Sequence, residues 1–112
     1  MKPQQLIIEP EILEYVKSYL MNLLDKKLCH LVLFGSHARG DYSADSDIDI
    51  LLVTATKLTY EEKDKITELE LEMLEKHNLY FSITIEEQNF VDKYSWLPFY
   101  KNISKDGISL YG

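Results

Sequence analysis

The chain has 112 residues, 46% of them hydrophobic, and carries a formal net charge of −7. This length suits one globular domain over residues 1–112, and the negative charge argues against extended DNA or RNA as a substrate, because phosphate backbones are repelled. No apolar run approaches the roughly 20 residues that span a bilayer, no signal-peptide pattern opens the chain, and a single cysteine excludes an internal disulfide. We therefore expect a cytoplasmic protein with no membrane segment.

The first half of the chain predicts a helix, two short strands and a turn between them. Pro10 suits a first helical position, and apolar residues recur at helical spacing after it. Each of two short apolar runs is bounded by polar or glycine residues, which is typical of buried strands. In chain order we expect a helix over 10–24, a strand over 31–34, a short helix over 36–40, a polar loop over 41–46 and a strand over 48–53.

The second half predicts one long helix, one alternating strand and a mixed tail. Thr59 and Glu62 have the spacing of a capping box, which opens a helix. We expect this helix to run to about Lys76, followed by a strand over 80–86, a tail helix ending near Lys105 with Gly107 as its C-cap, and a last strand over 108–111. The order of elements predicts an α+β fold, with a small mixed sheet and helices packed on one face.

Two short motifs stand on the two buried strands. Gly35 and Ser36 follow the first strand, where a turn can offer backbone N–H groups to phosphate. Asp47 and Asp49 stand two residues apart at the head of the second strand, so both carboxylates lie on one face while Ile48 points into a core. Two carboxylates form a hard oxygen site suited to Mg²⁺. The pair of motifs predicts a site for a nucleoside triphosphate and its metal.

This arrangement resembles the DNA polymerase β-type nucleotidyltransferase superfamily, whose pattern is Gly-Ser, a gap and Asp-x-Asp. The run from Gly35 to Val53, GSHARGDYSADSDIDILLV, is most similar to the minimal nucleotidyltransferases. The resemblance implies the polymerase β-like fold, with Asp47 and Asp49 as catalytic metal ligands for Mg²⁺ or Mn²⁺. It also implies nucleotide contacts from Gly35 and Ser36.

The resemblance further implies transfer of a nucleotidyl group, with ATP as the expected donor, to a hydroxyl group. The acceptor would be a tyrosine of a small helical HEPN-type toxin, since many such proteins act with a partner of this kind as a toxin–antitoxin pair. The sequence leaves the nucleotide, the acceptor and a homo-oligomer open.

One departure from the family pattern bears on catalysis. Superfamily enzymes usually carry a third carboxylate on a later strand beside the aspartate pair, which helps to activate the attacking hydroxyl. The polar face of the strand over 80–86 offers Ser82 at the expected place, while Glu86 lies about 13 Å further along by strand rise. If neither serves, the chain is an inactive family member that acts as a binding or antitoxin module.

Three neighbouring residues admit two interpretations each. Arg39, the only arginine, is a candidate nucleotide ligand because its planar guanidinium suits bidentate contacts to phosphate. The alternative is that it braces the loop over 41–45 through an ion pair. Ser46 is a candidate nucleotide contact, although its position favours a turn residue. His37 is expected to be exposed on the short helix. The tail aromatics are expected to pack in the core, with a partner surface as the alternative: Tyr94, Trp96, Phe99 and Tyr100.

Overall fold

The computed structural model of the chain describes residues 8–43 and 46–112. Its elements are α1 (Pro10–Leu24), the 3-10 helix η1 (Asp25–Lys27), β1 (Leu28–Phe34), α2 (Ser36–Arg39), β2 (Ile48–Thr54), α3 (Tyr60–His77), β3 (Phe81–Glu87), α4 (Gln88–Lys93), α5 (Pro98–Asp106) and β4 (Ile108–Tyr111). Within these described ranges, no helix is both long enough and apolar enough to cross a membrane.

The four strands form one mixed sheet in the order β3-β2-β1-β4. β1 runs antiparallel to both β2 and β4, whereas β2 and β3 run parallel and are joined by α3. A parallel pair needs such a crossover because its strands enter the sheet from the same end. The predicted mixed sheet is confirmed. β1 starts three residues earlier than the apolar run suggested.

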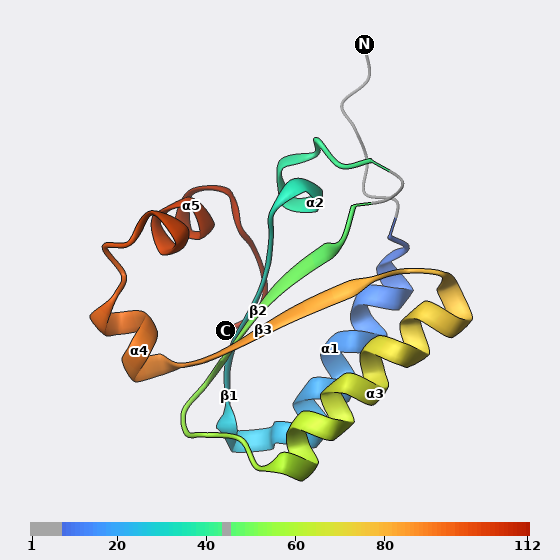
Figure 1. The fold of residues 1–112 in the computed structure, drawn as a ribbon, viewed down its shortest axis with the longest axis horizontal. Coiled ribbons are helices and arrows are strands. Elements are labelled where there is room, and N and C mark those ends of the chain that lie inside the picture. The colour runs from blue at the N-terminus through green and yellow to red at the C-terminus, as the bar shows by residue number, and fades with distance from the viewer. Residues whose placement is uncertain (1–7, 44–45) are drawn as a thin grey trace.

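The two long helices cover one face of this sheet, where Figure 1 shows α1 and α3 side by side. Both bury residues at helical spacing, which gives each an apolar stripe; the buried residues are Val16, Leu20 and Leu24 in α1 and Ile66, Leu69 and Met73 in α3. From β2, the side chains of Ile48, Ile50 and Leu52 join the same core. The main core therefore lies between the sheet and these two helices, as expected.

The short C-terminal helices α4 and α5 pack against the opposite face of the sheet (Figure 1). The sequence predicts helices on one face only, so this second layer is not predicted. Leu51 and Val53 of β2 meet Tyr100 and Ile103 of α5 there in a second, smaller core. The tail forms two helices rather than one, because the chain turns after Lys93 and restarts at Pro98, which is favoured at a first helical position. This second layer lies on the sheet face that carries Asp49.

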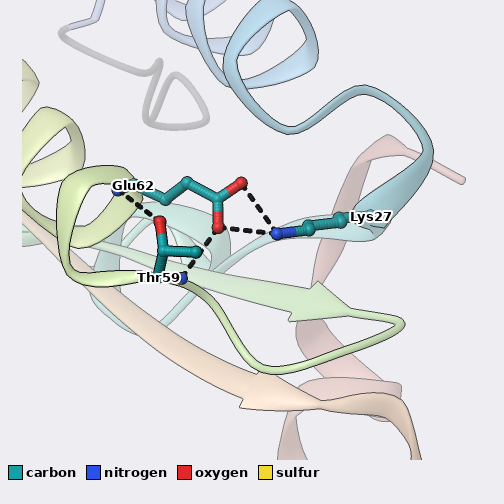
Figure 2. Close-up of polar contacts among 3 residues, drawn as sticks. All are labelled: Lys27, Thr59 and Glu62. Carbon is teal, nitrogen blue, oxygen red and sulfur yellow. Dashed lines mark hydrogen bonds and ion pairs between the residues drawn. The ribbon is translucent and has the colours of Figure 1, made fainter.

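The start of α3 has the capping box that the sequence predicts. The Thr59 hydroxyl accepts a hydrogen bond from the Glu62 backbone N–H at 3.1 Å, and the Glu62 carboxylate accepts one from the Thr59 N–H at 2.8 Å. Figure 2 shows that Lys27, from the turn before β1, reaches the same carboxylate at 2.9 Å. The contact joins the start of α3 to the start of β1.

Candidate active site

The Gly-Ser turn sits at the carboxyl end of β1 and starts the short helix α2. Gly35 has a φ of +76°, in the region that only glycine adopts readily, and a Cβ there would overlap the Asp49 carboxylate. Its carbonyl accepts a hydrogen bond from the Arg39 N–H at 3.1 Å, which closes the first turn. Glycine is required here for two reasons, the backbone conformation and the close approach of an acidic side chain.

The aspartate pair lies directly beside this turn. β2 begins at Ile48, which is 1% exposed in the main core, so Asp49 points to the opposite face, where it is half-buried. Asp47 precedes the strand and is exposed. Partial burial raises the pKa of Asp49 above its ordinary value, the charge of Asp47 raises it further, and interactions with His37 and Arg39 act in the opposite direction. The two carboxylates are therefore close enough to repel each other.

The register of the sheet settles what stands next to Asp49. Asp49 is paired with Phe34 on β1 and with Ser82 on β3, so these three residues form one row across the sheet. Glu86 is paired with Val53, four residues further along, and accepts a hydrogen bond from the Tyr100 hydroxyl at 3.3 Å. Within residues 8–43 and 46–112, no three acidic, histidine or cysteine side chains gather closely enough to hold a metal. The position beside Asp49 thus carries a serine, and Glu86 stands away from the pair.

The expectation of an exposed His37 is wrong. Its side chain is 3% exposed, its Nδ1 lies 3.0 Å from the Asp47 carbonyl oxygen, and its ring stacks on Tyr42. A helix of four residues has no solvent-facing side that the sequence could identify. Tyr42, which follows the helix, stacks on the His37 ring, and the Asp47 carbonyl lies against its Nδ1. The histidine is therefore internal to the motif.

Ser46 is placed as a turn residue. Its hydroxyl accepts a hydrogen bond from the Ser43 backbone N–H at 2.8 Å, and its own N–H donates to the Ser43 carbonyl at 3.1 Å. These contacts hold Ser46, the residue before Asp47, against Ser43. A contact between the Ser46 side chain and a nucleotide remains a prediction.

Arg39 has both features that its two interpretations require. Its Nε lies 3.2 Å from Asp41 Oδ2, in a pair whose side chains are 47% and 62% exposed. An ion pair so exposed contributes at most about 1 kcal/mol to stability. Asp45, at the far end of that loop, lies outside the described residues. Arg39 also lines a cleft beside Gly35, so an anion bound in that cleft would lie next to this residue.

This cleft has a volume of about 200 Å³ and runs between the Gly-Ser turn and α5. Sequence reasoning missed its far wall, which is formed by four residues of α5: Phe99, Asn102, Ile103 and Asp106. The spacing 99, 102, 103 and 106 marks one helical face and could have identified the wall. Among the tail aromatics, Tyr100 is buried as expected, whereas Trp96 is 62% exposed.

The donor set suits a hard dication. Mg²⁺ is typically held by one or two carboxylates together with phosphate oxygens and water, rather than by a complete protein cage. Asp47 and Asp49 supply two carboxylates beside a turn that can contact phosphate, which matches this requirement. Burial and repulsion raise the pKa of Asp49, and a bound dication would offset both effects.

Comparison with known proteins identifies the family. A family model described as nucleotidyltransferase domain matches residues 10–108. A protein of Methanocaldococcus jannaschii, MJ0604, provisionally named as a protein adenylyltransferase, is 34% identical over 104 residues, covering 92% of this chain and 97% of that protein.

Two solved structures share the fold. One is a toxin–antitoxin structure with AMP-PNP (TM-score 0.57, 21% identity, 88% of this chain and 73% of that one). The other is a tri-AMPylated Shewanella oneidensis HEPN toxin in complex with an MNT antitoxin (TM-score 0.57, 17% identity, 94% of this chain and 73% of that one).

Proposed function

This chain belongs to the nucleotidyltransferase domain family, and on that basis we propose that it transfers a nucleotidyl group from a metal-bound nucleoside triphosphate to a hydroxyl group. ATP is the proposed donor and Mg²⁺ or Mn²⁺ the proposed metal. The observation that carries the proposal is the contact between Gly35 and the Asp49 carboxylate. The Gly-Ser turn and the aspartate pair are therefore neighbours, which supports a proposed site that holds phosphate and metal together.

Each motif residue has a role in the proposed reaction. Gly35 and Ser36 hold the distal phosphates through the turn and the start of α2, and Arg39 neutralises phosphate charge from the cleft wall. Asp47 and Asp49 hold the metal. A dication at this position offsets negative charge on the transferring phosphate.

The step itself exchanges one bond for another. A bond forms between the acceptor oxygen and the α-phosphorus, and the bond from that phosphorus to the bridging oxygen of pyrophosphate breaks. The pyrophosphate leaves, and the hydroxyl proton passes to solvent. Catalysis then depends chiefly on position and charge, so few side chains suffice.

The proposed acceptor is a tyrosine hydroxyl on a small helical partner protein of the HEPN type. The name of the archaeal relative, protein adenylyltransferase, supports a protein as acceptor. The Shewanella complex supports a HEPN toxin, because that toxin carries AMP and is bound to a protein of the same fold.

A second candidate is an inactive family member that neutralises its partner by binding alone. The observation that favours it is Ser82 beside Asp49, where the superfamily pattern has an acid. In this case the chain would keep nucleotide and metal binding and form the complex without modifying the partner.

ATP labelled at different phosphates separates these candidates. The protein is incubated with Mg²⁺, a HEPN-type partner and ATP labelled either at the α- or at the γ-phosphate. Nucleotidyl transfer predicts label on the partner from α-labelled ATP only, and none with the Asp47→Asn, Asp49→Asn double variant. A stable complex that acquires no label from either ATP would support the binding module and contradict the enzyme.

A further inference from the structure

His37 connects the two halves of the candidate site. It is the second residue of α2, directly after Ser36, and it is 3% exposed. Its Nδ1 lies 3.0 Å from the carbonyl oxygen of Asp47, and its ring is stacked on Tyr42 with ring centres 4.8 Å apart and planes 1° apart. A single side chain thus links the phosphate turn, the following loop and the backbone of a proposed metal ligand.

The hydrogen bond also fixes which ring nitrogen carries a proton. A backbone carbonyl can only accept, so Nδ1 must donate, and the ring orientation follows. The ring plane is held independently by Tyr42. The side chain therefore has little freedom to reorient, and the Asp47 carbonyl is held from the side of α2.

The backbone at Asp47 is also anchored on both sides. Before it, Ser46 is hydrogen-bonded to Ser43, and after it β2 begins. The N–H of Ile48, the next residue, donates to the Tyr80 carbonyl at 2.8 Å and so ties the start of β2 to β3. This bond fixes Asp47 relative to the sheet but not relative to α2. His37 supplies the link to α2, which is the element that carries Ser36.

We propose that His37 is a positioning residue that sets the distance between the phosphate turn and Asp47, through its hydrogen bond to the Asp47 backbone. The proposal rests on the proposed function, because the distance matters only if phosphate and metal are held together. His37 itself touches neither group in this account. Groups that orient metal ligands from behind typically contribute about 10- to 100-fold to metal affinity.

Two substitutions separate the hydrogen bond from the packing. His37→Asn places an amide donor near the position of Nδ1 but removes the ring that stacks on Tyr42. His37→Phe keeps a stacked ring of similar size but removes the donor. If His37 only fills space, metal binding should follow thermal stability in both variants, and Phe should be the milder change.

The test is Mn²⁺ binding in the presence of AMP-PNP at one fixed pH, measured by electron paramagnetic resonance of the free ion, together with the melting temperature. We expect His37→Phe to weaken Mn²⁺ binding about tenfold, which corresponds to about 1.4 kcal/mol. We expect His37→Asn to stay within about threefold of the wild type even if it melts at a lower temperature. Amide hydrogen exchange at Ile48 should be faster in the Phe variant than in the Asn variant.

Two results would overturn the role of His37 while leaving the proposed function intact. One is that the wild type binds Mn²⁺ and His37→Phe binds it equally tightly. The other is an Asn variant that loses as much affinity as the Phe variant. A wild-type protein that binds neither Mn²⁺ nor AMP-PNP would instead overturn the proposed function, and the role of His37 with it.

Discussion

At the scale of single residues, the central feature is the contact of Gly35 with Asp49. Gly35 and Gly40 bound the short helix α2 and have similar positive φ values, +76° and +83°. A Cβ at Gly35 would overlap the Asp49 carboxylate. Their ψ values differ, −154° for Gly35 and 9° for Gly40, so Gly35 lies in a region nearly restricted to glycine and Gly40 in the left-handed helical region. Gly40 therefore serves as the control for replacing a positive-φ glycine next to α2.

We predict that Gly35→Ala abolishes binding of the Mg²⁺ complex of AMP-PNP, since the new methyl group must push the Asp49 carboxylate away. Gly40→Ala should cost about 1–2 kcal/mol of stability from the left-handed backbone alone and retain binding. Isothermal titration calorimetry and thermal melting of both variants test this. Equal losses of affinity in the two variants would contradict a specific role of the Gly35–Asp49 contact.

Asp49 should also affect stability as a function of pH. Its pKa is raised in the folded protein, so the folded state holds this proton more tightly than the unfolded state does. The free energy of unfolding therefore decreases as pH rises from about 3.9, the ordinary value, through the raised pKa. Without metal, Asp49→Asn should raise the melting temperature at pH 7 and leave it unchanged at pH 3.

The exposed Asp64 on α3 provides the control, because Asp64→Asn removes a carboxylate that does not affect the pKa of Asp49. Its melting temperature should follow the wild type at both pH values. The prediction is contradicted if the melting temperature of Asp49→Asn changes between pH 3 and pH 7 by as much as that of the wild type. In that case ionised Asp49 does not destabilise the metal-free protein.

Ser82 tests whether the third acid limits catalysis. Because Ser82 is paired with Asp49, Ser82→Asp places a carboxylate in the row that the family pattern uses. We expect transfer of AMP from labelled ATP to increase and the metal-free protein to melt at a lower temperature, since three like charges repel. Thr84→Asp, two residues further along the strand and opposite Leu51, should not increase transfer. A Ser82→Asp variant with lower transfer than the wild type would refute this explanation.

At the scale of elements, a helix or strand is predicted well where a local sequence signal marks its ends. The capping box at Thr59 and Glu62 identifies the start of α3, and alternation along 80–86 identifies β3, both within one or two residues. The tail is less predictable. Pro98 is favoured at the start of α5, but the place of α5 in the fold depends on packing of Tyr100 and Ile103 against β2. The three-residue extension of β1 toward its start likewise depends on pairing with β2, where Leu28 meets Thr54.

We predict that Thr59→Ala lowers the free energy of unfolding by about 1 kcal/mol, the usual contribution of a side-chain cap. The Thr59 hydroxyl is the acceptor for the Glu62 N–H, which the alanine leaves without this partner. Thr56→Ala, in the exposed turn just before, should change stability by a few tenths of a kcal/mol at most. Urea denaturation measures both, and equal midpoints would contradict the role of the cap.

At the scale of the whole molecule, the two motifs could be predicted from the sequence as one site because each follows or precedes an apolar run of its own. The wall of the cleft opposite the Gly-Ser turn could not be predicted. Phe99, Asn102 and Asp106 reach the Gly-Ser turn only because α5 folds over the face that carries Asp49, and that placement depends on the strand order. The predicted exposure of His37 is wrong for the same reason, since its ring is covered by Tyr42 and its Nδ1 lies against the Asp47 carbonyl.

The most direct test of the central claim, that this chain is a nucleotidyltransferase acting on a partner protein, is intact-mass spectrometry of a HEPN-type partner co-expressed with it. The account predicts that the partner gains the mass of one or more AMP groups with the wild-type chain and none with the Asp47→Asn, Asp49→Asn variant. A partner that co-purifies with the wild-type chain and carries no added nucleotide would contradict it.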